Sequence, residues 1–149
     1  DALLKKGVNV ALGTDGSASN NNVNMFEEMH LAALVNKAVT EDAESVPAQQ
    51  VLRMATINGA KALGLENEIG SLEVGKRADL ILLDANKPHY FPRHNPVSSI
   101  AYSAQAADVS TVLVNGQVLL ENYQLKTIDL QETMQEAERM AFDLVRRAT

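Results

Sequence analysis

Apolar residues recur at helical spacing in the first half of the chain and at strand spacing in much of the second half. The helical spacing predicts one helix from Asn24 to about Lys37 and another that begins near Pro47, a residue suited to a first helical turn. We expect Asn58-Gly59 to break the second helix and Gly64 to end the short helical piece that follows. The change of period near residue 67 predicts a boundary between two structural units.

A short apolar run comes before these helices. Val8–Leu12 lies between two glycines and is rich in β-branched residues, which predicts a parallel strand buried on both faces. The polar loop of residues 13–22 follows, built from Gly, Asn, Asp and Ser, which favour turns and tolerate positive φ. Loops at the carboxyl ends of parallel strands are where α/β proteins place their chemistry, so this loop is the first candidate for a functional site.

The second half of the chain is expected to be mainly β structure. The aliphatic run Ala78–Asp84 predicts a buried strand, and a proline-rich loop from Asn86 to Pro96 follows it. Two further β runs, Val109–Val114 and Gln117–Leu120, are joined by Asn115-Gly116. Because Asn-Gly is the pair that a type I′ turn requires, the sequence predicts a hairpin here.

A last helix is predicted after Asp129, whose side chain can cap its first turn. Ion pairs between Glu136 and Arg139 and between Asp143 and Arg147 are expected on its solvent side. The apolar residues of this helix share one face at helical spacing, and they are Leu130, Met134, Ala137, Ala141 and Leu144.

Composition narrows the class of protein. The 149 residues are 46% hydrophobic and 21% charged, which is typical of one soluble globular domain. The net charge of −6 gives no electrostatic drive toward nucleic acid, and no apolar stretch approaches the roughly 20 residues that cross a bilayer. The absence of cysteine excludes disulfides and thiolate metal sites, and with no signal pattern at the N-terminus we expect a cytoplasmic protein without nucleic-acid or membrane partners.

The residues alone leave the chemistry of the loop open. Asp15, between two glycines and just beyond the predicted strand, is placed to ligate a metal, to act as a general base or to cap a turn by bonding nearby amides. The first two roles require the carboxylate to face a cavity, and the third requires only its own loop. The histidines give no further support, because His30 is on a predicted helix while His89 and His94 share a loop, and we expect surface or locally bonded roles for all three.

Five stretches in order carry a resemblance to a known family. They are Gly13-Thr14-Asp15-Gly16 followed by Ser19-Asn20-Asn21, then Met25-Phe26-Glu27-Glu28-Met29, Met54-Ala55-Thr56-Ile57-Asn58-Gly59-Ala60, the run from Ile69 to Leu80, and Val114-Asn115-Gly116. The chain resembles the C-terminal portion of a metal-dependent amidohydrolase of the cytosine deaminase and chlorohydrolase group. Within that group the resemblance is closest to the 5-methylthioadenosine/S-adenosylhomocysteine deaminases.

The resemblance implies an incomplete α/β fold. Residues 1–66 would be the C-terminal end of a TIM-barrel catalytic domain, comprising the last strand and helices of a (β/α)8 barrel. Residues 67–126 would form part of a small β-sandwich domain, and residues 127–149 a C-terminal helix. A whole barrel needs about 250 residues, so the remaining N-terminal part of the enzyme is an expected partner, together with further copies in a homo-oligomer.

The resemblance also assigns roles to the loop. Asp15 would bind a catalytic divalent ion, zinc or else iron, and would move a proton from the activated water to the leaving amine of an adenine-type nucleoside. Thr14, Ser19 and Asn20 would support that aspartate or line the substrate loop. The histidine ligands of the family have no counterpart here, so we expect the 149 residues alone to be inactive. Two alternatives remain: dehalogenation or deamination of another heterocycle by the same mechanism, and a non-catalytic structural module.

Overall fold

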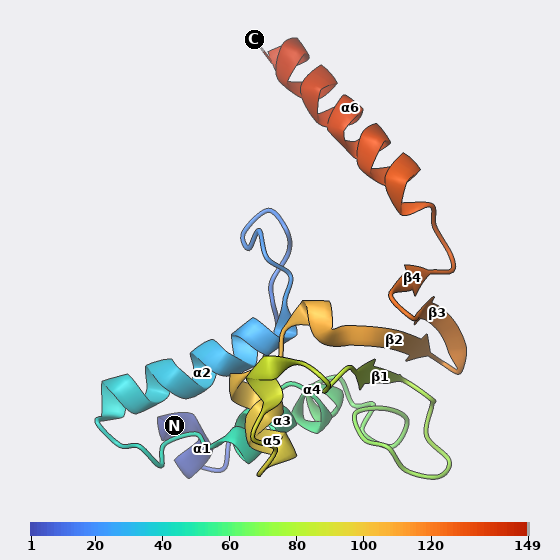
Figure 1. Ribbon diagram of the computed structural model, residues 1–149. Coiled ribbons are helices and arrows are strands. Elements are labelled where there is room, and N and C mark those ends of the chain that lie inside the picture. Colours follow the sequence, from blue (N-terminus) through green and yellow to red (C-terminus); the bar gives the residue numbers. More distant parts are fainter. Residues whose placement is uncertain (149) are drawn as a thin grey trace.

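The computed structural model describes residues 1–148, which form a layer of helices, an antiparallel sheet beside it and a terminal helix that projects away from both (Figure 1). The helices are α1 (Ala2–Lys5), α2 (Met25–Thr40), α3 (Ala48–Met54), α4 (Ile57–Ala62), α5 (Pro96–Tyr102) and α6 (Leu130–Ala148), with 3-10 turns at Pro88–Tyr90 and Ala106–Asp108. The strands are β1 (Leu80–Leu83), β2 (Val109–Val114), β3 (Gln117–Glu121) and β4 (Gln124–Leu125), and they lie in that order across the sheet.

The core lies among α2, α3 and α5. Its buried residues are Met29, Ala33, Val46, Val51, Met54 and Ala101. The contribution from α5 was not predicted, because the predicted proline-rich loop ended at Pro96 and no element was assigned to the residues that follow it. Asn95 begins α5 by accepting a hydrogen bond from the backbone N of Ser98, and Pro96 occupies the first turn, where its missing N–H costs nothing.

Helix α2 begins where the sequence predicts and ends three residues beyond the predicted Lys37. The Asn24 side chain accepts a hydrogen bond from the backbone N of Phe26, and Glu41 closes the helix in the left-handed conformation. Besides the buried face that carries Met29 and Ala33, α2 has an exposed apolar stripe made of Leu31, Leu34, Val35 and Val39. A helix with apolar residues on both faces is typical of one that is covered on both sides in the complete fold.

The predicted strand Val8–Leu12 is wrong. The segment pairs with no strand of the described chain and is not part of the sheet, and Val8 is exposed rather than buried. A strand needs neighbouring strands to pair with, and the described part of the chain supplies none here. The segment lies instead against the helices that follow it: Leu12 N donates to Met54 O at 2.9 Å, and the Asn58 side chain donates to Val10 O at 2.9 Å.

The predicted break at Asn58-Gly59 is also wrong. Both residues lie inside α4, and the chain turns two residues earlier at Thr56, where φ is −130° and ψ is −99°. Asn58 is tolerated within a helix because its side chain donates to the Val10 carbonyl rather than competing for its own turn, while its backbone carbonyl accepts a hydrogen bond from the Asn9 side chain. The predicted stop at Gly64 is confirmed, with φ of +70°.

The sheet confirms one prediction and corrects another. β2 and β3 form the predicted hairpin, with Val114 paired to Gln117 and with positive φ at both Asn115 (+50°) and Gly116 (+78°). β1 pairs antiparallel with β2, but its predicted burial is wrong, since Ile81 and Leu82 are both about half exposed. Because successive side chains of a strand point to opposite faces, both faces of β1 are partly exposed.

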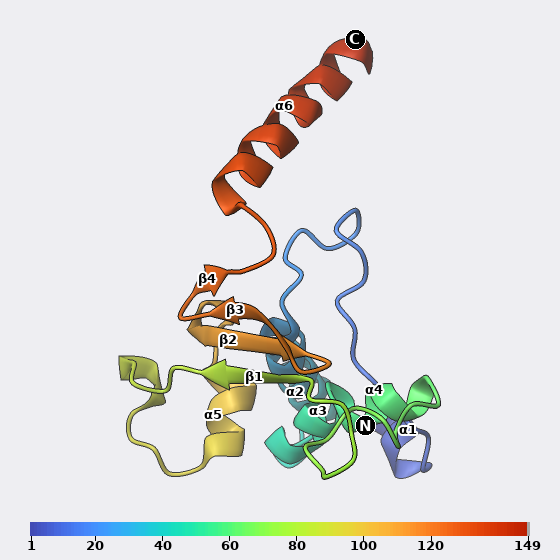
Figure 2. The same cartoon turned by 90° about the vertical axis from the view of Figure 1, so that its right-hand side faces the viewer.

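Helix α6 forms as predicted and stands clear of the rest of the chain (Figure 2). Asp129 Oδ1 accepts a hydrogen bond from the backbone N of Glu132, and the expected pair of Glu136 with Arg139 is present. The expected pair of Asp143 with Arg147 is replaced by one with Arg146 at 2.8 Å, while Arg147 donates to the Asp143 carbonyl. No helix within residues 1–148 has the length and apolar character needed to cross a membrane.

The hairpin turn generates a first prediction. Gly116→Val places a β-branched side chain at positive φ and should lower the free energy of unfolding by roughly 1 kcal/mol or more. Urea unfolding of the chain measures this, with Gln117→Val as the control, because residue 117 already has strand geometry. Equal stability of the two variants would contradict the type I′ assignment.

Candidate functional site

The loop of residues 13–24 projects from the helical layer between the segment 8–12 and α2 (Figure 1). Asp15 lies in it with a positive φ of 59°, and its side chain is exposed. Its Oδ1 accepts a hydrogen bond from the backbone N of the next residue, Gly16, at 2.6 Å. Among the described residues the carboxylate is therefore bonded only within its own loop, as the turn-capping role requires, and it is open to solvent.

Asn20 closes the base of the loop. Its Nδ2 donates to the Thr14 carbonyl at 3.0 Å and to Oε1 of Glu28 at 2.9 Å, and its Oδ1 accepts a hydrogen bond from the backbone N of Asn22. The half-buried Asn20 amide thus joins the start of the loop to the first turn of α2. Asn20 thereby holds the N-terminal end of the loop, next to Asp15, against that helix.

Glu28 is a member of this arrangement that the sequence did not single out as functional. It lies in the first turn of α2, where an acidic side chain also interacts favourably with the positive end of the helix dipole. The available signal was its position, a carboxylate one turn into the helix that directly follows a polar loop.

Thr14 and Ser19, the other two predicted residues of the loop, differ in how they are hydrogen-bonded. Thr14 is half-buried, and its Oγ1 donates to the Asp15 carbonyl at 3.1 Å, so it belongs to the same hydrogen-bonded unit. Ser19 takes part only through its backbone, which donates to the Gly16 carbonyl at 2.9 Å, and its side chain is exposed. The structure therefore brings Thr14, Asp15 and Asn20 together and leaves the Ser19 hydroxyl outside that unit.

Histidines do not join Asp15. His30 packs edge-on against Tyr102 with ring centroids 6.1 Å apart, and Nε2 of His89 donates to the Asp108 carboxylate at 2.9 Å. Within residues 1–148 no three His, Asp or Glu side chains are gathered so that they could hold a metal ion. Asp15 fits a divalent ion as a single ligand, since carboxylate oxygens ligate zinc and its Oδ2 carries no hydrogen bond from the described residues, but it cannot hold one alone.

The most heavily bonded titratable group is elsewhere, and the sequence did not reveal it. Asp108 is 2% exposed, and it accepts hydrogen bonds from Lys87 at 2.9 Å, from His89, from the Tyr90 hydroxyl at 2.8 Å and from the backbone N of Gln105. Burial by itself raises the pKa of the Asp108 carboxyl, but the four donors outweigh it and hold that pKa well below its ordinary value.

The same cluster raises the pKa of two of the groups that donate to Asp108. Burial, with the hydrogen bond to Asp108, raises the pKa of the Tyr90 hydroxyl, and the bond to Asp108 raises the pKa of Lys87. All three side-chain donors come from the loop 87–90, so the carboxylate fastens that loop to the start of β2. We assign the cluster a structural role.

The two hydrogen bonds that Asn20 donates to the Thr14 carbonyl and to Glu28, here called the Asn20 clamp, can be tested separately from any activity. Asn20→Asp removes the donor and places a carboxylate opposite Glu28, so exchange of the backbone amides of residues 16–22 should accelerate at least about fivefold, which corresponds to a loss of about 1 kcal/mol. Hydrogen exchange followed by mass spectrometry measures it. Asn21→Asp, the same change at an exposed neighbour, is the control, and equal acceleration in both would refute the clamp.

The Asp108 cluster predicts a pH dependence. Because the folded-state pKa of Asp108 is depressed, its stabilisation is complete above the unfolded value near 3.8 and is lost as the pH falls below it. At neutral pH, Asp108→Asn should cost about 2 kcal/mol or more of unfolding free energy, and the difference from wild type should shrink on acidification. Glu44→Gln, at an exposed carboxylate, is the control; a pH-independent difference would contradict the assignment.

Comparison with proteins of known sequence identifies relatives over nearly the whole chain. The chain is 57% identical over 147 residues to a 5-methylthioadenosine/S-adenosylhomocysteine deaminase of Thermoanaerobacter pseudethanolicus, which covers 99% of this chain and 34% of that protein. It is 51% identical to a 5'-deoxyadenosine deaminase of Methanosarcina acetivorans, covering 98% of this chain and 33% of that protein. The chain thus spans about a third of the length of the curated relatives that it matches.

Solved structures give the same relationship. An adenosine deaminase from Xanthomonas campestris with bound zinc superposes with a TM-score of 0.93 at 40% identity, covering 98% of this chain and 33% of that chain. An atrazine chlorohydrolase from Arthrobacter aurescens complexed with zinc has a TM-score of 0.83 at 33% identity over 91% of this chain and 30% of its own. These neighbours imply a TIM-barrel-based fold, of which the chain is an α/β part with a four-stranded antiparallel sheet.

The match to a family model is extensive. The model of the amidohydrolase family aligns with residues 1–119, which include the loop of Asp15, helices α1 to α5 and the hairpin up to β3. With this match over more than half of its length, and with relatives of more than 50% identity, the chain belongs to the amidohydrolase family.

Proposed function

We propose that these residues are part of an enzyme that deaminates an adenine nucleoside, such as 5-methylthioadenosine or S-adenosylhomocysteine, with a metal-activated water. The observation that carries the proposal is the 57% identity to the Thermoanaerobacter deaminase over almost the entire chain. Since the chain spans a third of that relative, the activity is proposed for the complete polypeptide. This chain contributes the loop of Asp15, the helices beside it and a sheet.

Asp15 is proposed as the metal ligand and proton carrier of this chain. Gly16 N holds Oδ1, which leaves Oδ2 to face a divalent ion, with zinc proposed because the solved neighbours contain it and iron as the alternative. A bound divalent ion lowers the pKa of water toward neutrality and so supplies a nucleophile. With the ion bound, the Asp15 carboxylate would accept a proton from the water whose oxygen bonds to the ring carbon, and it would pass that proton to the amine nitrogen, which leaves as ammonia when the C–N bond breaks.

The remaining loop residues act on Asp15 through its position. Asn20 ties the Thr14 carbonyl to Glu28 of α2, so the backbone one residue before Asp15 is held against a helix rather than left free. A carboxylate that must both ligate and carry a proton depends on such positioning, because a displacement of about 1 Å at a reacting group can cost 10²-fold in rate. We propose Asn20 and Thr14 as positioning residues and Ser19 as a residue of the substrate loop.

The choice of substrate class rests on the degree of identity. The relatives between 48% and 58% identical are named for adenine nucleosides, whereas the chlorohydrolase neighbour is 33% identical. Adenine-nucleoside deamination is therefore the leading proposal, and dehalogenation or deamination of another heterocycle by the same mechanism is the alternative within the class.

The structure also supports a covalently attached or separate remainder of the enzyme as a partner. The outer stripe of α2, with Leu31, Leu34, Val35 and Val39, is uncovered, and the backbone of Val8–Leu12 has no neighbouring strand in the described chain. Both features are what an incomplete barrel exposes, because barrel strands pair on two sides and barrel helices pack on two neighbours. Homo-oligomerisation stays a prediction.

Substitution of Asp15 tests the mechanism. In the complete enzyme loaded with zinc, Asp15→Asn should lower kcat for adenine-nucleoside deamination by at least about 10²-fold, because the amide neither carries the proton nor ligates as an anion. Ammonia release measures the rate, and zinc content by mass spectrometry measures the ligand role. Asp42→Asn is the matched control, since Asp42 is an exposed aspartate that also bonds a nearby backbone N–H, here that of Glu44. Full activity of Asp15→Asn, or no deamination by the unaltered enzyme, would reject the proposal.

A further inference from the structure

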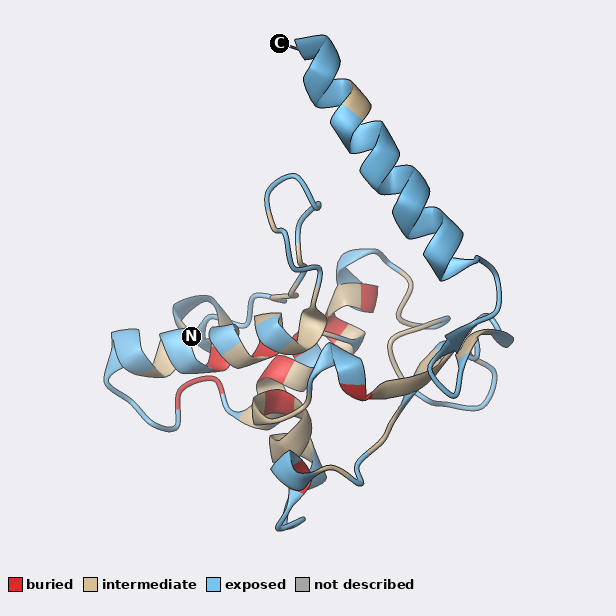
Figure 3. Ribbon diagram, turned by 45° about the horizontal axis from the view of Figure 1, so that its top comes forward, coloured by how far each residue is buried: buried red, intermediate tan, exposed pale blue. Residues whose placement is uncertain are grey.

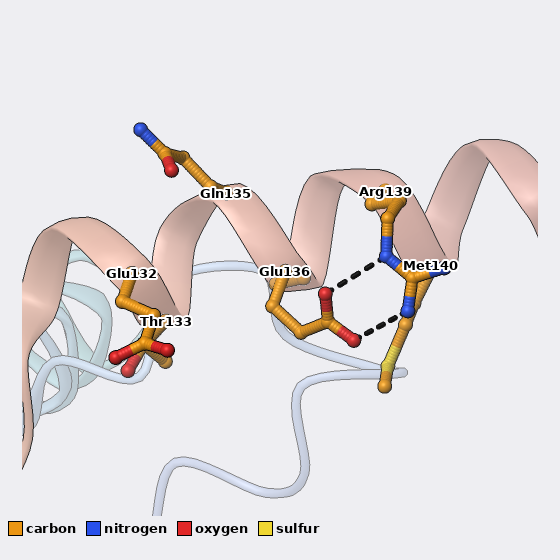
Figure 4. Close-up of a pocket in the computed structure, with 7 residues that line it drawn as sticks. Glu132, Thr133, Gln135, Glu136, Arg139 and Met140 are labelled. Atoms are coloured by element: carbon orange, nitrogen blue, oxygen red, sulfur yellow. Dashed lines mark hydrogen bonds and ion pairs between the residues drawn. The ribbon is translucent and has the colours of Figure 1, made fainter.

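Helix α6 has two faces of opposite character. On one face, Glu136, Arg139, Asp143 and Arg146 are linked along the helix by ion pairs, and Figure 4 shows the two hydrogen bonds between Glu136 and Arg139. On the other face lies the α6 stripe, which we define as Leu130, Met134, Ala137, Ala141 and Leu144. These four charged side chains are thus paired within the helix, and its apolar side is left for another surface.

The α6 stripe is uncovered in this chain. No described residue of α6 is buried, and Leu130, Met134 and Leu144 are 55%, 53% and 63% exposed. The exposed colour runs along almost the whole helix in Figure 3. A strongly amphipathic helix gains most of its stability in proteins from packing its apolar face, so α6 requires a surface that the described residues do not provide.

The orientation of α6 nevertheless recurs in a solved protein. The superposition on the Xanthomonas adenosine deaminase covers 98% of the chain with a TM-score of 0.93, and α6 contributes 19 of the 149 residues, so the agreement includes α6. This chain covers only 33% of that protein. The contacts within this chain do not fix the orientation of α6, because the helix buries none of its own residues. The simplest explanation of the shared orientation is packing of α6 against polypeptide outside the matched third.

The size of the α6 stripe argues against a second copy as the occupant. A helix of 19 residues is about 28 Å long and about 10 Å wide, so one face offers a footprint of about 300 Å². Stable interfaces between separate proteins bury about 800 Å² on each partner. Packing within one polypeptide avoids the loss of translational and rotational freedom, so a footprint of this size is sufficient there.

We propose that α6 is an intramolecular docking helix whose stripe packs against the part of the complete polypeptide that lies outside these 149 residues. The helix follows the last strand and lies beyond residues 1–119, so this role is additional to the part of the chain that the family model describes. The inference rests on the proposed function in one respect: the polypeptide that covers α6 is taken to be the part of the enzyme that the longer deaminase relatives contain outside the matched third. It does not require Asp15, zinc or substrate.

Hydrogen exchange of α6 tests the proposal. The 149-residue chain is compared with a chimera in which it replaces the matching 147 residues of the Thermoanaerobacter deaminase, which supplies the other two thirds. Amides of residues 130–148 should exchange at least about tenfold more slowly in the chimera, at every protein concentration. Leu144→Glu in the chimera should restore fast exchange, and the milder Leu144→Ala should give an intermediate rate. Circular dichroism establishes that each variant is folded.

Gln135→Glu is the matched control, because it adds the same charge to the same helix at an exposed residue outside the α6 stripe (Figure 4). Slow exchange in Gln135→Glu together with fast exchange in Leu144→Glu supports docking through the α6 stripe. Equal rates in the chain and the chimera, or equal effects of both substitutions, overturn it. So does protection in the 149-residue chain that rises with concentration, which would identify a second copy as the occupant. The readout uses no substrate, so loss of deamination and loss of docking are separate results.

Discussion

The position of the candidate site depends on a small set of hydrogen bonds between residues about fifty apart in the sequence. The segment before the loop is held against α3 and α4 by Leu12 N on the Met54 carbonyl, and by Asn58, which donates to the Val10 carbonyl and accepts from the Asn9 side chain. Asn58 is 7% exposed, so leaving its buried amide without a partner would cost about 1–3 kcal/mol. Asp15 lies three residues after Leu12, the last residue of the segment that makes one of these bonds.

The other end of the loop is fixed by a different kind of contact. Asn20 bonds both Thr14 and Glu28, so the two ends of the loop and the first turn of α2 form one unit, while the residues between them remain exposed. Asp15 lies within this held frame, with Oδ1 bonded to Gly16 N and Oδ2 available. A site that shares its ion with ligands from other elements needs this combination of a fixed base and an accessible carboxylate.

Apolar side chains are exposed on three separate elements of the chain. α2 carries apolar residues on both faces, β1 exposes Ile81 and Leu82, and α6 exposes a whole stripe. Single exposed apolar side chains are ordinary, but three separate elements with uncovered apolar faces are typical of surfaces that meet other polypeptide. The chain spans about a third of the relatives that it matches, and polypeptide outside that third is the cover that we propose for these faces.

The sequence by itself determined the features whose causes are local. The cap of α2 at Asn24, the stop at Gly64, the Asn115-Gly116 turn and the amphipathic α6 depend on residues within a few positions of each other. Five short motifs in order, each local, were sufficient to indicate the family. Tertiary structure decided the rest. Val8–Leu12 is not a strand and β1 is not buried, because pairing and burial belong to neighbours that the described chain lacks. Asn58, Glu28 and Asp108 gained their roles from partners 48, 8 and about 20 residues away, and no local pattern encodes a contact over such separations.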